Sequence, residues 1–357
     1  MTTTTTQPQP NHTTLPQLHF IIGIGRSGTT LINQILNANP HCLSTPETKF
    51  VMTFYSKYAH QTAINPDELF QDIRTYYHTL RKDKQIDIWK LNYTQLQQQL
   101  QQYEPLNYAN ACRLFLLNMY YLERSNDQVR CIADKNPSYV SYLPQLLQLF
   151  PDAKFIISLR DYRAVFNSSQ QSKGNPIITP TVRLLRWREH FNILSQYTQA
   201  MPDRFFWLPY EKLVHDNENK IRQLCLFLQI PFDTQMSQSH EPIKHWIATH
   251  TNELANNPRQ QKKWTDLSRP INPMRSESWR QNLSPSQIIF AELICGNIGQ
   301  QFGYIPTQPA KLPQQIISLL RHLPALIYAL PIYWFFARYY FWLPIRWRLA
   351  IIARLKH

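Results

Sequence analysis

Residues 18–30 have the sequence LHFIIGIGRSGTT, in which a largely apolar run passes into a glycine-rich turn. The run at 18–23 is typical of a buried strand. Beyond the turn, Leu31, Ile35 and Leu36 recur at helical spacing within residues 29–38. The segment therefore predicts a strand, a loop and a helix in that order. Three of the chain's seven glycines lie in this one loop.

Short apolar runs of the same kind recur along the chain. Residues 129–133, 154–159 and 205–208 predict three further buried strands, and helical patterns occupy 143–150, 162–171 and 183–197. Strands that alternate with helices form parallel sheets with helices on both faces. The sequence therefore predicts an α/β fold with a central, mostly parallel sheet.

Residues 50–127 have a different composition, which is rich in Tyr and Gln, helical in pattern and without a clear strand. The near-polyglutamine tract 95–102 carries Leu96 and Leu100 one helical turn apart, which favours a solvated helix. We expect this region to be a helical insertion that covers one end of the sheet.

The composition limits the class of protein and its organisation. The chain has 357 residues, of which 43% are hydrophobic and 17% charged, so it is not wholly disordered and can form one large α/β domain. We expect that domain at residues 18–305, between a disordered leader at 1–17 and a proline-rich linker at 306–313. The leader has no apolar core, so it does not resemble a signal peptide.

The five cysteines are odd in number, scattered and never spaced as CxxC. Neither a disulfide framework nor a zinc site is expected from this pattern. Free thiols are typical of a reducing compartment, so we expect a cytoplasmic protein.

Half of the net charge lies in the last part of the chain. The chain carries +14, and residues 311–357 hold seven basic residues, no acidic ones and many aromatic ones. The longest apolar run there has 16 residues, between Arg321 and Arg338, which is short for a membrane-spanning helix. We expect residues 314–357 to lie peripherally in the inner interface of a membrane, with rings at headgroup depth and arginines near anionic lipid. The alternative is a helical hairpin that packs on the body or on a second subunit.

The glycine-rich turn has the composition of an anion-binding loop. Glycines permit a nest of N–H groups, and the N-terminus of the following helix adds its dipole. We expect a phosphate to be held by the amides of residues 26–30, by the Ser27, Thr29 and Thr30 hydroxyls, and by Arg26. Thr29 stands where a nucleoside-triphosphate loop has its lysine, which argues against ATP or GTP hydrolysis. The alternative is a tight turn without a ligand.

Arg160 and Ser168 predict a second anion site. Arg160 follows the strand predicted at 154–159, and Ser168 lies eight residues later, two turns into the next helix. The carboxyl ends of parallel strands face the crevice in which such sheets bind ligands. The alternative is an ordinary surface ion pair between Arg160 and Asp161.

Together, the two sites resemble those of sulfotransferases that depend on 3′-phosphoadenylyl sulfate (PAPS). The resemblance rests on Gly25-Arg26-Ser27-Gly28-Thr29-Thr30 and on Arg160 with Ser168. Similarity to the tyrosylprotein sulfotransferase branch runs through about residues 18–305. It comprises Asn39-Pro40, Glu47-Thr48-Lys49, Asp134-Lys135-Asn136-Pro137, residues 150–155, 210–214 and 227–231, and 269–272 with Trp279. The resemblance implies the sulfotransferase fold, a phosphate-loop-like parallel sheet, with the insertion as a cover on the acceptor side.

The resemblance also implies how the donor is bound. Residues 25–30 would cradle the 5′-phosphosulfate of PAPS, and Arg160 and Ser168 would hold its 3′-phosphate. Tyr210 and Arg269 would complete the nucleotide pocket. In the alternative interpretation, Tyr210 and Arg269 are only structural.

For the chemical step, the resemblance implies that Glu47 is the general base for the acceptor hydroxyl, best with its pKa raised by burial. Arg26 and Lys135 would stabilise the sulfuryl group. In the alternative interpretation, Glu47 is a solvated loop residue and Lys135 an ordinary ion-pair partner. His41 and His60 are rival bases, since classical cytosolic members of the family use a histidine.

Two positions differ from the luminal members of the family, which have cysteines near the base and near the lysine. Thr45 and Ala133 stand there in this chain, which suits a reducing compartment and weakens the case for a protein-tyrosine substrate. The acceptor hydroxyl is left open among lipid, glycan, metabolite and tyrosine. The family also suggests a homodimer.

Two other functions stay open. A small-molecule kinase with a degenerate phosphate loop would need a lysine after Gly28 and a magnesium-binding aspartate, and only Asp134 meets this need. A nucleic-acid-binding module would carry positive charge over its whole body, whereas half of the charge here lies in the C-terminal segment. The sequence favours a sulfotransferase without a metal or a nucleic-acid partner.

Overall fold

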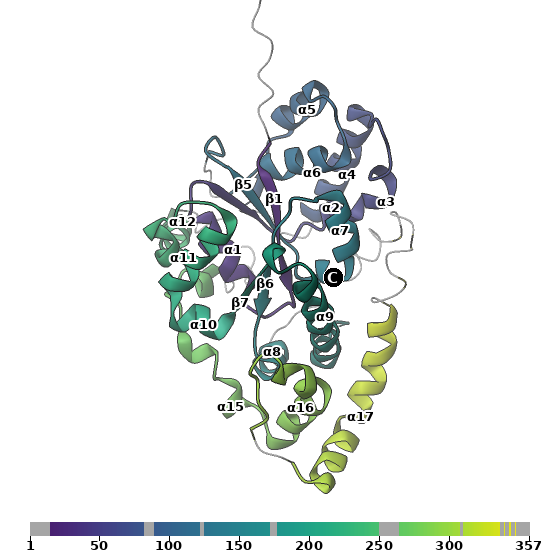
Figure 1. Cartoon of the computed structure of the whole chain (residues 1–357), viewed down its shortest axis with the longest axis vertical. Coiled ribbons are helices and arrows are strands. Elements are labelled where there is room, and N and C mark those ends of the chain that lie inside the picture. The colour runs from purple at the N-terminus through teal and green to yellow at the C-terminus, as the bar shows by residue number, and fades with distance from the viewer. Residues whose placement is uncertain are drawn as a thin grey trace, which may run out of the picture.

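A five-stranded parallel sheet in the order β2-β5-β1-β6-β7 forms the centre of the computed structural model (Figure 1). Its strands are β1 (Gln17–Gly23), β2 (Cys42–Thr45), β5 (Cys131–Lys135), β6 (Phe155–Leu159) and β7 (Phe205–Pro209). In this order β1 lies between β5 and β6. After β1, the chain first forms β2 and β5 on one side of β1 and then β6 and β7 on the other side. The end of β1 is therefore the topological switch point, where such sheets bind ligands.

The structure describes residues 15–81, 89–121, 125–171, 177–249, 264–307 and 310–335, with Tyr339, Leu343 and Trp347 besides. Most of the predicted leader, and nearly all of the chain beyond residue 335, lie outside the described residues.

Four of the five strands confirm the predicted sheet. The predicted strand at 129–133 is found two residues later, so that Lys135 is the last residue of β5. Strand β2 was not predicted, because its four residues CLST include two polar ones and so show no apolar run. All four are buried because β2 pairs with β5 under the covering helices.

Helices cover both faces of the sheet, and alternate residues of each strand face the two layers. Ile21 packs with α1 (Thr29–Asn37), α10 (Tyr210–His215) and α11 (Asn217–Leu228). Its neighbours Phe20 and Ile22 pack on the other side with α7 (Leu143–Leu149), α8 (Tyr162–Gln170) and α9 (Pro180–Ala200). Burial on both faces explains why the strands are continuous apolar runs rather than alternating ones.

The insertion is helical, as predicted, but it also contains two strands. Its helices are α2 (Phe50–Thr53), α3 (Tyr55–Tyr58), α4 (Pro66–Arg81), α5 (Tyr93–Gln102) and α6 (Tyr108–Leu117). Two three-residue strands, β3 (Trp89–Leu91) and β4 (Met119–Tyr121), pair antiparallel, so the expectation of no strand was wrong. Segments this short carry no periodicity, and only their pairing defines them. The glutamine-rich helix α5 buries Leu96 and Leu100, as its spacing predicts.

The remaining helices are α12 (Glu241–Thr249), α15 (Trp279–Asn282), α16 (Pro285–Gln300) and α17 (Leu312–Trp334). In Figure 1, α17 runs along the outside of the molecule beside α16 and towards α9, and it contacts both helices. Among the described helices, α17 alone is long and apolar enough to cross a membrane, by length and composition only. It begins at Leu312, inside the stretch expected to be a linker.

Candidate active site

The loop between β1 and α1 has the backbone of an anion-binding loop. Arg26 has φ 76° and Gly28 has φ 96°, so two residues lie in the left-handed region and turn successive amides to one side. Arg26 holds this conformation although it has a side chain, which costs on the order of 1–2 kcal/mol. Gly28 caps α1 without a side-chain hydrogen bond, which leaves the first amides of the helix available to a ligand.

Two glycines of this loop allow other side chains to approach it closely. A Cβ on Gly28 would lie 2.5 Å from ring carbon Cδ2 of Tyr210, the first residue of α10. A Cβ on Gly25 would collide with Nη1 of Arg183, on α9. Tyr210 therefore lies at the loop, as predicted, and Arg183 is a second neighbour that the sequence analysis missed.

The Ser27 hydroxyl points into the protein and is not available to bind a phosphate, contrary to the prediction. Its side chain is buried, and its Oγ lies 2.5 Å from the carbonyl of Ile24 and 3.0 Å from Oγ of Ser158. The Ser158 hydroxyl donates to the Ser27 carbonyl at 2.8 Å. These bonds tie the loop to β6. Only the amide of Ser27 is left to bind an anion, with Thr29 mostly buried and Thr30 half-buried beside it.

Arg160 and Ser168 both lie at the loop. Arg160 is 8% exposed and donates from its two terminal nitrogens to the carbonyls of Arg26, at 3.0 Å, and Arg275, at 2.8 Å. Its guanidinium lies 4.2 Å from the ring centre of Tyr210. Its Nε is buried and has no hydrogen-bond partner within the part of the chain that the structure describes. Ser168 accepts a hydrogen bond from Nε of Arg26 at 3.0 Å, so the two predicted anion sites adjoin.

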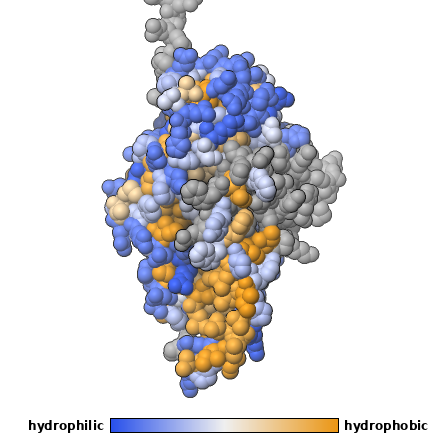
Figure 2. Space-filling view, turned by 90° about the vertical axis from the view of Figure 1, so that its right-hand side faces the viewer, coloured by the Kyte–Doolittle hydropathy of each residue, from blue (hydrophilic) through white to orange (hydrophobic). Residues whose placement is uncertain are grey.

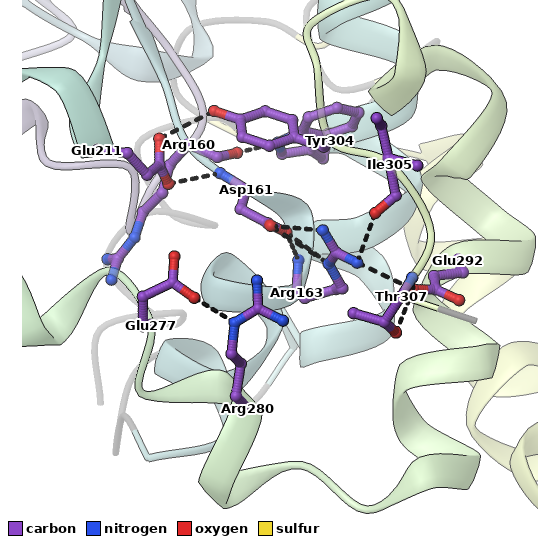
Figure 3. Close-up of polar contacts among 11 residues, drawn as sticks. Arg160, Asp161, Arg163, Glu211, Glu277, Arg280, Glu292, Tyr304, Ile305 and Thr307 are labelled. Carbon is purple, nitrogen blue, oxygen red and sulfur yellow. Dashed lines mark hydrogen bonds and ion pairs between the residues drawn. The ribbon is translucent and has the colours of Figure 1, made fainter.

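The alternative ion pair between Arg160 and Asp161 is wrong. Asp161 pairs instead with Arg163 at 2.8 Å and accepts the Arg163 amide at the start of α8 (Figure 3). Arg163 also pairs with Glu292 at 3.0 Å, and Glu211 accepts the Asp161 amide and the Tyr304 hydroxyl, each at 3.0 Å. This network holds the end of β6 in place and leaves the Arg160 side chain directed to the loop.

Glu47 and Lys135 come from neighbouring strands. Glu47 lies two residues beyond β2, and Lys135 ends β5, the strand paired with β2. Lys135 is 8% exposed, and among the described residues no hydrogen-bond or ion-pair partner of its ammonium is found. A buried cation that has a nearby carboxyl group but no direct hydrogen bond or ion pair is costly, so this arrangement favours an anionic ligand. Glu47 is exposed, so the burial expected for the base is not found.

The insertion positions the loop that carries Glu47. The Tyr76 hydroxyl, on α4, donates to the Thr48 carbonyl, and the Tyr108 hydroxyl, on α6, donates to the Val51 carbonyl at 2.8 Å. From the sheet side, the Lys49 amide donates to the Asn136 side chain at 3.1 Å. Glu47 therefore projects from a backbone that is fixed on both sides.

Asp134, beside Lys135, is a buried carboxyl group. Its Oδ1 accepts hydrogen bonds from Thr45, at 3.1 Å, and Asn136, at 2.7 Å, while Oδ2 has no hydrogen-bond partner among the described residues. Burial raises the pKa of Asp134 to about 7, and the nearby Glu47 charge acts in the same direction, against the two hydrogen bonds and Lys135. This group can therefore be neutral or charged near neutral pH.

Two arginines on α9 extend the positive charge towards Glu47. Burial first, and then the charges of Arg26 and Arg186, lower the pKa of Arg183 to about 10, while Glu47 opposes the shift. Glu47 also interacts electrostatically with Arg186. His190, one turn further on, places its Nδ1 2.7 Å from the Gly23 carbonyl, so it donates there and anchors the end of β1. The helical spacing of these residues is visible in the sequence, but the sequence does not show which residues they contact.

Arg269 does not join the other predicted residues. Its side chain is 65% exposed, and its ionic partner is Asp266 at 3.9 Å. Arg275, six residues later, contacts the site instead, because its carbonyl accepts from Arg160 and its side chain pairs with the same Asp266 at 3.1 Å. Among the described residues, no three His, Cys, Asp or Glu side chains gather as metal ligands.

A parallel sheet with a phosphate loop at its switch point, and with cations at the end of β5, just after β6 and on α9, defines an α/β protein whose site suits a polyanionic ligand. The sequence pattern described as "Sulfotransferase family" matches residues 19–234. The chain therefore belongs to the sulfotransferase family, and it is a sulfotransferase.

Curated relatives agree with this assignment. A putative protein-tyrosine sulfotransferase of Caenorhabditis briggsae is 24% identical over 231 residues, which are 64% of this chain and 70% of that protein. Protein-tyrosine sulfotransferase 1 of Danio rerio is 25% identical over 232 residues, 63% of this chain and 57% of the relative. For protein-tyrosine sulfotransferase A of Caenorhabditis elegans, 24% identical, the match covers 52% of the relative. The chain thus spans only part of the length of these relatives.

Solved structures share the fold. The sulfotransferase domain of the Synechococcus PCC 7002 olefin synthase superposes with a TM-score of 0.54 at 20% identity, over 85% of this chain and all of that one. The sulfotransferase domain from the curacin biosynthetic pathway gives 0.51 at 19% identity, over 82% of this chain. The predicted sulfotransferase fold is confirmed.

Proposed function

We propose that this sulfotransferase takes its sulfuryl group from PAPS and transfers it to an acceptor hydroxyl, with Glu47 as the general base. The observation that carries the proposal is the hydrogen bond of 3.0 Å between Arg26 and Ser168. It joins a loop suited to a 5′-phosphosulfate to a second cationic region around Arg160. A donor with phosphates at both the 5′ and 3′ positions would occupy both.

The residues present suit such a donor. The amides at the start of α1 have no side-chain cap, and Nε of Arg160 is buried without a partner. Burial and the neighbouring Arg160 lower the pKa of Arg26, so the two cations destabilise each other until an anion binds. The 3′-phosphate is assigned to Arg160 and Ser168, and the base of the nucleotide to the surroundings of Tyr210.

The proposed step is an in-line displacement at sulfur. The acceptor oxygen forms a bond to sulfur as the bond between sulfur and the 5′-phosphate oxygen breaks, and adenosine 3′,5′-bisphosphate leaves. The acceptor's proton passes to the Glu47 carboxylate. Lys135 and Arg26 stabilise the charge that develops on the sulfuryl oxygens and the leaving oxygen. Arg183 and Arg186 add further positive charge on the Glu47 side of the site.

The acceptor in this proposal is a compound that carries a hydroxyl group. A tyrosine hydroxyl is one candidate, because several relatives are named protein-tyrosine sulfotransferases. The five cysteines are all free and buried, which supports a reducing, cytoplasmic setting for the enzyme. A kinase that uses ATP is less well supported, since Thr29 stands in place of the lysine that would bridge the β- and γ-phosphates.

Calorimetric titration of the full chain with adenosine 3′,5′-bisphosphate, beside ATP and 5′-AMP, tests the donor. We expect the bisphosphate to bind at least about tenfold more tightly than 5′-AMP, because only it reaches Arg160. Tighter binding of ATP than of the bisphosphate would favour the kinase. The variant Arg222→Gln is a matched control, since this exposed arginine on α11 pairs with Glu218 at 2.7 Å and should leave both affinities unchanged.

A further inference from the structure

Helix α17 is attached to the body through a narrow inner face of small and polar residues. Ser318 is buried and donates its hydroxyl to the Ser286 carbonyl, on α16, at 2.7 Å. The ring of His322 stacks on Phe290 of α16 at 4.5 Å between ring centres. Ala329 is fully buried. These residues follow one another at intervals of four and seven, so they form one stripe of the helix.

The outer face of α17 carries large apolar side chains instead. The exposed fractions of these residues lie between 39% and 68%. The residues are Leu312, Ile316, Leu319, Leu320, Leu323, Ile327, Leu330 and Trp334. Apart from the adjacent Leu319 and Leu320, they recur every three or four residues and form a continuous apolar surface along α17 (Figure 2). We call this set the outer stripe. A surface helix of a soluble domain turns its apolar stripe inward, and here the stripe faces outward.

The outer stripe ends beside α9, which α17 contacts. Tyr333, in the last turn of α17, donates its hydroxyl to the Glu189 carboxylate on α9, and burial together with Glu189 raises the pKa of Tyr333 to about 12. Tyr333 also interacts electrostatically with Arg186, which in turn interacts with Glu47. The last turn of α17 therefore lies at α9, the helix that also carries Arg183 and Arg186.

Electrostatic charge distinguishes between two possible binding partners of the outer stripe, a second copy of the chain and a lipid surface. Residues 311–357 contain seven basic residues and no acidic residue, so a second copy of the chain would bring like charges together. An anionic lipid surface would attract the same residues, at about 1 kcal/mol for each Lys or Arg near the surface. Trp334, at the end of the stripe, suits the headgroup region, where indole rings accumulate.

We propose that the outer stripe of α17 docks on the surface of an anionic lipid bilayer, and that the acceptor hydroxyl belongs to a molecule embedded in that bilayer. The acceptor part rests on the proposed function. The helix lies along the membrane and does not cross it, because crossing would break the contacts of Ser318 and His322 with α16. In this orientation, the end of α17 brings the membrane surface to the Arg186 and Glu47 side of the enzyme.

Vesicle flotation of the full chain tests the docking. The vesicles are phosphatidylcholine alone, and phosphatidylcholine mixed with phosphatidylglycerol. We expect binding to the mixed vesicles, and about tenfold or more weaker binding for the double variant Leu320→Glu/Ile327→Glu, which places two charges in the outer stripe. The control is Leu226→Glu on α11, where an equally apolar side chain is 81% exposed, and it should bind as the wild type does.

Three outcomes would overturn the docking. The first is wild-type protein that binds neither kind of vesicle, and the second is a double variant that binds as tightly as the wild type. The third is light scattering that shows the wild type as a dimer and the double variant as a monomer. The last result would assign the stripe to a second copy. Calorimetry with adenosine 3′,5′-bisphosphate checks that the double variant is folded, because neither substituted residue touches the phosphate loop.

The acceptor part is tested with sulfur-labelled PAPS and two extracts of the same cells, the membrane lipids reconstituted in vesicles and the water-soluble fraction. We expect label to enter the lipid phase with the wild type and much less with the double variant. Label that enters only the water-soluble fraction would overturn this part while leaving the docking intact. Failure of the bisphosphate titration together with normal vesicle binding would refute the proposed donor and not the membrane surface.

Discussion

Nε of Arg26 lies 3.0 Å from the hydroxyl of Ser168, although 142 residues separate them in the chain. One residue belongs to the phosphate loop after β1, and the other to the helix after β6. The hydrogen bond exists because β1 and β6 are neighbours in the sheet, so that the loops at their carboxyl ends meet. If the donor binds as proposed, this relationship couples the binding of its two phosphates.

Replacement of Arg160 by Ala should weaken binding of adenosine 3′,5′-bisphosphate by about 2–4 kcal/mol, the usual cost of losing one partner of a buried charge contact. The affinity for 5′-AMP should change much less, because that nucleotide lacks the 3′-phosphate. Calorimetry of both ligands with the wild type and the variant measures the difference. Equal losses for the two nucleotides would show that Arg160 only supports the Arg26 carbonyl and the loop.

Gly28→Ala should abolish measurable nucleotide binding. The new Cβ would lie 2.5 Å from the Tyr210 ring, and the residue would keep a φ of 96° that alanine rarely adopts. Gly303→Ala is the matched control, because Gly303 has a φ of 83° but open space around it. Both variants should lose about 1–2 kcal/mol of folding stability through the backbone. Only Gly28→Ala should lose a further 1–3 kcal/mol, roughly, from overpacking, together with ligand binding.

The parts of the fold that sequence patterns could predict are those that depend on local order. A buried parallel strand must be apolar on both faces, and a phosphate loop is typically rich in glycine, because glycine adopts left-handed backbone conformations without strain. Residues 18–30 meet both conditions, so β1, the loop and α1 were predictable. Arg160 was predictable for a related reason, since it follows an apolar strand at the carboxyl end of the sheet.

The parts that could not be predicted depend on contacts between distant segments. Arg183 reaches the loop only because α9 packs across the end of β1, and no local sequence pattern predicts this packing. The inward turn of the Ser27 hydroxyl depends on Ser158, which lies 131 residues away. Arg269 was expected at the nucleotide pocket, and only the path of the loop decides that the Arg275 carbonyl meets Arg160 instead.

Glu47→Gln should leave bisphosphate affinity unchanged and lower the turnover of PAPS by about 10²–10⁴-fold, the usual contribution of a general base. The amide keeps the shape of the side chain but cannot accept the acceptor's proton at neutral pH. Release of the bisphosphate from PAPS, followed with any accepted hydroxyl compound, measures turnover. Glu218→Gln, at another exposed carboxylate, is the control. Normal turnover by Glu47→Gln would leave His41 and His60 as the bases to test.

The carboxyl group of Asp134 should make the folded state less stable as pH rises. Its pKa in the fold is about 7, against 3.8 for an unperturbed aspartate, so between these values the folded chain holds a proton that the unfolded chain has released. Stability therefore falls across this range and is constant above it. Asn at this position could still accept both hydrogen bonds at Oδ1, and its amide would stand where Oδ2 now has no partner.

Asp134→Asn should therefore be more stable than the wild type above about pH 7, by on the order of 2–4 kcal/mol, and the difference should shrink towards zero near pH 4. Urea unfolding of both proteins at several pH values measures it. His19 and His190, whose pKa values burial lowers to about 4 and about 3, destabilise both proteins alike on acidification, so their effect cancels in the difference. A pH-independent difference would mean that Asp134 stays ionised in the fold, held so by the ammonium of Lys135.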